Sequence, residues 1–111
     1  MHYVMTDIHG DYYHFMKMLD EVRFSGDDDL YIIGDVIDRG SENIEMLSFC
    51  MRYENVHLIK GNHEYFMELA GQGRLPEAQW KRYGGSKTLR QLSSMAWFER
   101  EELNEYIESL P

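Results

Sequence analysis

The chain has 111 residues, 43% of them hydrophobic and 28% charged, which suits one small globular domain. With 11 Lys and Arg against 20 Asp and Glu, the formal net charge is -9, which excludes sequence-independent nucleic-acid binding and disfavours an anionic membrane surface. The lack of a long uncharged apolar run excludes a membrane span, and the single cysteine, Cys50, excludes an internal disulfide and favours a cytoplasmic location.

Strand and helix patterns alternate from the first residues onward. Residues 3–5 form a short apolar run that predicts a strand, and over residues 11–22 apolar side chains recur at helical spacing. The acidic run at residues 27–29 indicates a solvated turn rather than a calcium loop, because it lacks the spaced ligands of such a loop. Residues 30–33 predict a second strand that ends at Gly34.

Two further helix patterns and one more strand follow. Ser41 is predicted to cap a helix whose apolar residues, from Ile44 to Met51, share one face. Residues 56–59 predict a third strand, and a third helix begins at residues 64–69. Three strand-then-helix cycles predict right-handed crossovers and a parallel sheet, so the fold class is α/β.

The C-terminal part of the sequence is less regular and mainly helical. Residues 86–92 predict a short helix, and residues 99–110 predict a charged amphipathic helix. No linker interrupts the sequence. We therefore expect one domain over residues 1–111, with a βαβ core in residues 1–70 and a helical extension in residues 71–111.

Each predicted strand is followed by residues that commonly bind metal ions or phosphate. The carboxyl ends of parallel strands lie along one edge of a sheet, where open α/β proteins place their ligands, so we expect these residues to converge. They are Asp7 and His9 after the first strand, Asp35, Asp38 and Arg39 after the second, and Asn62 and His63 after the third. The other histidines are interpreted as surface or packing residues: His2, His14 and His57.

These residue types favour divalent-metal and phosphate chemistry. Carboxylate, imidazole and amide groups suit Mn²⁺, Fe²⁺ or Zn²⁺, and the lack of thiolates argues against a structural zinc. A carboxylate such as Asp35 can bridge two ions, and a water bound there, with its pKa lowered towards about 7, would supply hydroxide to attack phosphorus. Arg39 offers a planar fork for phosphate oxygens, and a His63 held by Asp38 can protonate a leaving group.

Three motifs together resemble a known family. They are D-x-H-G at residues 7–10, G-D-x-x-D-R-G at residues 34–40 and G-N-H-E at residues 61–64. This pattern resembles the signature of the PPP-type metallophosphatases, in the calcineurin-like metallophosphoesterase superfamily. It is most similar to bacterial and phage members, namely the lambda-type serine/threonine protein phosphatases and the symmetrical diadenosine tetraphosphatases. A looser match follows at Trp80 and residues 84–89.

The resemblance implies a fold and a metal site. The family fold is an α/β/β/α sandwich, of which this chain would form the N-terminal, three-stranded βαβ half. Two divalent ions are implied, Mn²⁺ first, with Fe or Zn as alternatives. Their ligands would be Asp7, His9, Asp35 and Asn62, with Asp35 as the bridge.

The resemblance also implies an activity and its catalytic residues. Hydroxide bound to the metal ions would hydrolyse a phosphomonoester, as in a serine/threonine protein phosphatase. His63 would be the general acid, paired with Asp38, while Arg39 and Asn62 would bind the phosphate. The implied substrates are a phosphorylated protein, a small phosphoester or a dinucleoside polyphosphate.

Family features that come from the C-terminal half are not found in this sequence. Members complete the second metal site with two later histidines and add a second phosphate-binding arginine, whereas no histidine follows His63 here. The second site would then hold only Asp35 and Asn62. Residues 110–111 resemble the junction where the second half begins, so the sequence leaves open a natural short protein or a fragment.

A sheet without its second half would leave one apolar face exposed. Such a face predicts self-association, or a partner that supplies the missing C-terminal half. Its candidate residues are Tyr31, Ile33, Val56 and Leu58. Two alternatives to an active phosphatase therefore stay open: a non-catalytic metal- or phosphate-binding remnant, and an interaction half that needs a second chain.

Overall fold

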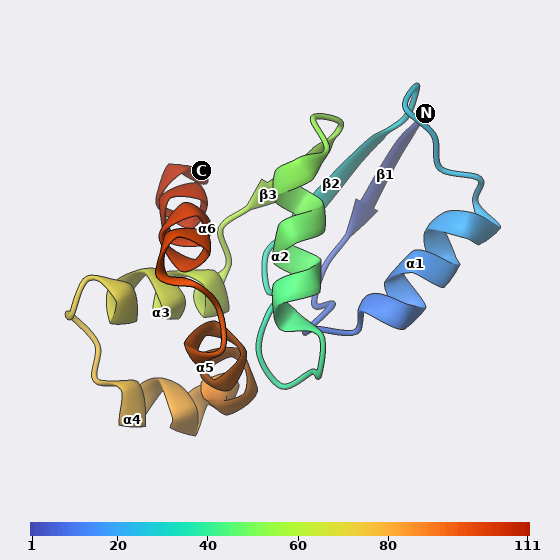
Figure 1. Cartoon of the computed structure of the whole chain (residues 1–111). Helices are drawn as coiled ribbons and strands as arrows, with labels where there is room; N and C mark the ends of the chain where they lie inside the picture. The colour runs from blue at the N-terminus through green and yellow to red at the C-terminus, as the bar shows by residue number, and fades with distance from the viewer.

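A three-stranded parallel sheet organises the chain, and this computed structural model describes all residues from 1 to 111 (Figure 1). The strands are β1 (His2–Met5), β2 (Asp29–Ile33) and β3 (Val56–Ile59), and they lie in the order β1-β2-β3. Val4 is in register with Tyr31, and Tyr31 with His57. The predicted parallel sheet and α/β class are thus confirmed.

One face of the sheet is covered by the helices that connect its strands. These are α1 (Tyr12–Glu21) and α2 (Asn43–Arg52), and α2 crosses in front of the sheet in Figure 1. Their buried apolar residues join those of β2 and β3 in a single core. Among the core residues are Phe15, Leu19, Leu30, Ile32, Met46, Leu47, Val56 and Leu58.

The opposite face of the sheet is exposed. Its open apolar side chains are Val4 at 70% exposure, Ile33 at 46% and Ile59 at 39%. Of the residues predicted for this face, Ile33 and Tyr31 lie on it, and Tyr31 stacks on His57 with ring centroids 4.7 Å apart. The prediction is wrong for Val56 and Leu58, because the alternation of β3 turns both side chains into the core.

The remaining helices form a second layer beside β3. They are α3 (Asn62–Gly71), α4 (Glu77–Trp80), a kinked turn (Lys81–Gly85) in which Gly84 has a non-helical φ of 105°, α5 (Ser86–Ser93) and α6 (Trp97–Ser109). The contacts run from α3 to α6 and from α5 to α2, so this helical segment is packed on the sheet-bearing part (Figure 1). None of the helices has both the length and the apolar composition needed to cross a bilayer.

Two helix starts differ from the sequence-based expectation. Ser41 does not cap α2, which begins at Asn43 after the N-cap Glu42, whose N–H donates to the carbonyl of Gly10 at 3.0 Å. The third helix begins at Asn62 rather than at Glu64. Asn62 and His63 of the third motif therefore lie in the first turn of α3.

Candidate functional site

The loops that follow the three strands meet at one edge of the sheet. The N–H of His9 donates to the carbonyl of Asp35 at 3.0 Å, and the N–H of Gly10 donates to that of Val36 at 2.7 Å. The third loop touches the second so closely that a Cβ on Gly34 would lie 2.6 Å from the Cα of Gly61. Only glycine fits this contact, which brings the residues after β2 and β3 together.

Three of the predicted ligands form one cluster. Donor atoms of Asp7, His9 and Asp35 all lie within 4.8 Å of one another. His9 Nδ1 is 2.9 Å from the carbonyl oxygen of Ile37, which can only accept, so Nδ1 carries the proton and Nε2 is free to bind a metal ion. Two carboxylates and an oriented imidazole fit a divalent transition metal.

The motif residues have an unusual backbone conformation. Six non-glycine residues adopt a left-handed φ, and five of them belong to the motifs. Those five are Asp7 (56°), His9 (46°), Asp35 (59°), Asp38 (74°) and Arg39 (68°). L-residues are strained in the left-handed region, and such strain concentrates where side-chain placement matters for function. The sequence gives no signal of it, because glycine would be the expected residue at each position.

The buried side chain of Glu64 holds the loop after β2 and the loop after β3 together. Its Oε1 accepts the N–H groups of Asp35 at 2.7 Å and Gly61 at 2.8 Å, and its Oε2 accepts that of Val36 at 3.0 Å. Burial raises the pKa of the Glu64 carboxyl above its usual value, and the three N–H donors oppose that rise. The sequence identifies Glu64 only as part of a motif and does not predict that it anchors Asp35.

Asp38 and His63 form a buried pair, as the sequence suggested. Asp38 is fully buried, and its Oδ2 lies 2.8 Å from His63 Nδ1. The same Oδ2 accepts from the indole Nε1 of Trp80 at 2.8 Å, while Oδ1 accepts from Thr88 Oγ1 at 2.7 Å. Because Nδ1 of His63 is engaged, its Nε2 is the atom left for another partner. The contacts of Trp80 and Thr88 were not predicted, although both residues lie in the looser motif match.

A cleft of about 410 Å³ opens beside this pair. Arg39, Asn62 and His63 line it, together with Phe66, Arg82, Tyr83 and Gly84. It adjoins the acidic cluster, because the His63 ring lies 4.9 Å from the His9 ring and the His63 N–H donates to Asp35 Oδ1 at 3.1 Å. All seven predicted site residues thus lie in two adjoining places, and their roles there stay predictions.

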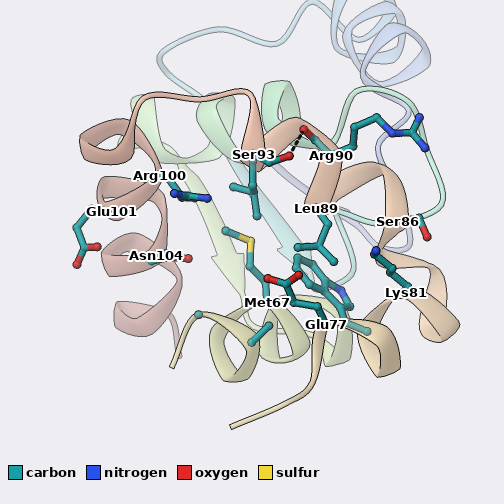
Figure 2. A pocket seen from close by; sticks show the side chains of 14 residues that line it. Met67, Glu77, Lys81, Ser86, Leu89, Arg90, Ser93, Arg100, Glu101 and Asn104 are labelled. Carbon is teal, nitrogen blue, oxygen red and sulfur yellow. Dashed lines mark hydrogen bonds between the residues drawn. The ribbon is translucent and has the colours of Figure 1, made fainter. Parts of the chain in front are cut away.

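A larger cavity lies elsewhere. It measures about 680 Å³ and lies between α3, α4, α5 and α6 (Figure 2). Figure 2 shows Glu77 and Arg100 pointing into it, whereas Arg90 and Glu101 point away. Of the residues around the metal cluster and acid pair, only Trp80 lines it. The predicted site residues therefore lie at the smaller cleft and in the cluster beside it, and none of them lines this cavity.

The remaining histidines lie outside both places. His14 Nδ1 contacts Asp11, the N-cap of its own helix, at 2.8 Å. His57 Nε2 lies 2.9 Å from an oxygen of Asp29, and His2 Nδ1 lies 3.8 Å from the other oxygen of the same carboxylate, on the open sheet face. Each of these histidines pairs with a carboxylate away from the motif cluster.

Comparison with known proteins agrees with the motifs. The family model for calcineurin-like phosphoesterases matches residues 3–109. Similar proteins named "Bis(5'-nucleosyl)-tetraphosphatase, symmetrical" occur in Neisseria gonorrhoeae, 36% identical over 74 residues, in Erwinia tasmaniensis, 38% over 76, and in Coxiella burnetii, 26% over 111. These matches cover 65%, 65% and 97% of this chain but only 27%, 28% and 38% of those proteins, so the chain spans well under half their length. Because the family model matches nearly the whole sequence, the chain belongs to the calcineurin-like phosphoesterase family.

Proposed function

We propose that this chain carries the N-terminal part of a metal-dependent phosphoester hydrolase site. One observation carries the proposal: a cluster of Asp7, His9 and Asp35 adjoins the buried Asp38–His63 pair. Metal ligands and a proton donor next to each other are what phosphoester hydrolysis needs. Membership of a phosphoesterase family supports the same conclusion.

The metal ions would be held at the edge of the sheet. Asp7, His9 and Asp35 would ligate the first ion, and Asp35 with Asn62 would contribute to a second, with Mn²⁺ as the first candidate. When bound, such ions act as Lewis acids on phosphoryl oxygens and lower the pKa of water. Glu64 holds the backbone of Asp35 by accepting its N–H at 2.7 Å.

The proton and the phosphate would be handled by the neighbouring residues. Water would form a bond to phosphorus as the bond to the leaving oxygen breaks, and that oxygen would take the Nε2 proton of a His63 imidazolium. The proton lost by the attacking water would return to Nε2 through solvent. Asp38 accepts from Nδ1 and so orients the ring. Arg39 lies exposed in the same cleft, where its guanidinium can bind two phosphate oxygens.

The substrate we propose is a small phosphoester, with dinucleoside polyphosphates as the leading class. The names of the similar proteins from Neisseria, Erwinia and Coxiella support this class over a phosphorylated protein. We further propose that residues 1–111 act as one unit, since Trp80 and Thr88 from the helical extension complete the surroundings of Asp38.

The test is Mn²⁺-dependent hydrolysis of para-nitrophenyl phosphate by the purified chain, with a chelated control. Chelation should abolish turnover, and His63→Asn should reduce turnover while Mn²⁺ binding is retained. Unchanged turnover in His63→Asn would contradict the acid role. If the chain binds neither Mn²⁺ nor phosphate, the proposal fails.

A second candidate function is that of an interaction half that needs another chain. The open sheet face favours it, because Val4, Ile33 and Ile59 expose apolar side chains together. Ile33→Lys should then shift self-associated chain towards the monomer in sedimentation velocity. Met18→Lys is the matched control, since Met18 is 49% exposed on α1, against 46% for Ile33. A wild-type chain that stays monomeric at high concentration would argue against self-association through this face.

A further inference from the structure

The cleft beside His63 has a charge opposite to that of the whole chain. Two arginines, Arg39 and Arg82, line it, and no acidic residue does, although the chain carries a formal net charge of -9. Neither arginine forms an ion pair within the chain. Two unpaired guanidinium groups at one cleft favour a ligand with more than one anionic group.

The same cleft has an aromatic wall that leads away from the metal cluster. The Phe66 ring lies 5.4 Å from the His63 ring, and the Tyr83 ring stacks on Phe66 with centroids 4.7 Å apart and planes inclined by 29°. Gln79 donates to the Tyr83 hydroxyl at 2.8 Å, which fixes the orientation of that ring. Because Tyr83 is 40% exposed, part of the ring is open to a ligand.

We propose that this cleft binds the nucleotide leaving group of a dinucleoside polyphosphate, with its base stacked on Tyr83 and its phosphates bound by Arg82. This inference rests on the proposed function, in which His63 gives its proton to the leaving oxygen. A leaving group must lie next to its proton donor, and His63 lines this cleft. Stacking on a tyrosine suits any nucleobase, so the subsite selects for a base without selecting which one.

The cleft fits a nucleotide better than a phosphorylated tyrosine side chain. A volume of about 410 Å³ has the size of a small-molecule site. A phosphotyrosine carries one phosphate, whereas Arg39 and Arg82 together match a chain of phosphates. The names of the similar proteins also specify nucleosyl substrates.

The test compares two ligands that differ only in the base, AMP and ribose 5-phosphate. Binding is followed by NMR titration in the presence of chelator, where no turnover occurs. The chain should bind AMP at least about fivefold more tightly. Tyr83→Phe should keep this preference and Tyr83→Leu should abolish it, with the affinity for ribose 5-phosphate unchanged. Arg82→Gln should weaken ADP more than AMP, while Lys87→Gln, on α5 outside the cleft, should not.

The outcomes separate this inference from the proposed function. Equal affinity for the two ligands, or a preference for AMP that survives Tyr83→Leu, overturns the nucleoside subsite. Mn²⁺-dependent turnover of para-nitrophenyl phosphate would still support the hydrolase in that case. A chain that binds neither Mn²⁺ nor either sugar phosphate overturns both proposals together.

Discussion

The indole of Trp80 donates to the carboxylate of Asp38 at 2.8 Å, across 42 residues of sequence. The same carboxylate holds His63, so a residue of the helical extension shares a buried acceptor with the predicted proton donor. Thr88 supplies the third hydrogen bond, on the other oxygen. A buried carboxylate with all its donors in place is fixed in position, and it fixes the imidazole in turn. The sheet-bearing part and the helical segment therefore cannot be separated without disturbing the acid pair.

Trp80→Phe is expected to destabilise the chain by about 1–3 kcal/mol, because it removes one donor from a fully buried carboxylate and leaves a small void. Urea unfolding followed by circular dichroism measures this loss. Trp97→Phe is the matched control, since Trp97 is 74% exposed. Equal unfolding midpoints for the two variants would show that the indole hydrogen bond adds nothing to stability.

The sequence could predict the sheet and the convergence of the motifs because both follow from short-range patterns. Residues 56–59 form a mainly apolar run that is followed by a glycine at position 61, and parallel strands bring their carboxyl ends to one edge. It could not predict which face of β3 would be covered, since Val56 and His57 are both plausible core or surface residues until the helices are placed. Nor could it predict the left-handed backbone at Asp35, whose N–H is held by Glu64 from another segment.

Glu64→Gln tests the anchor behind the metal cluster. Glutamine offers one acceptor oxygen and an NH₂ group, so at least one of the N–H groups of Asp35, Gly61 and Val36 would face a donor. We expect a loss of about 1–3 kcal/mol in the free energy of unfolding, together with weaker Mn²⁺ binding, since Asp35 loses its support. Glu45→Gln, an exposed change on α2, is the control for charge. Wild-type stability and Mn²⁺ affinity in Glu64→Gln would contradict the anchor role.

Asp35→Asn tests the cluster itself. Its carboxylate is the donor shared by both implied ions, and an amide carries no charge to replace it. Mn²⁺ affinity, measured by isothermal titration calorimetry, should fall by at least about tenfold. Asp20→Asn removes the same charge from the exposed face of α1 and should leave the affinity unchanged. If both variants weaken Mn²⁺ binding equally, the effect comes from net charge and not from ligation.

Cys50 should be inert in the folded chain. It is buried in α2, and burial raises the pKa of its thiol from 9.0 to about 12. At pH 8.5 iodoacetamide should therefore label the chain in urea quickly and the native chain far more slowly, because only the thiolate reacts.

The same shift makes stability depend on alkaline pH. The folded state binds the Cys50 proton more tightly than the unfolded state, so the contribution to stability is complete below pH 9 and is lost as the pH rises through about 12. The urea midpoint of the wild-type chain should thus fall more steeply between pH 8.5 and 10.5 than that of Cys50→Ala, which has no thiol to ionise. If the urea midpoints of the two chains fell equally with pH, Cys50 would ionise as readily in the folded state as in the unfolded one. Rapid labelling of the native chain at pH 8.5 would lead to the same conclusion.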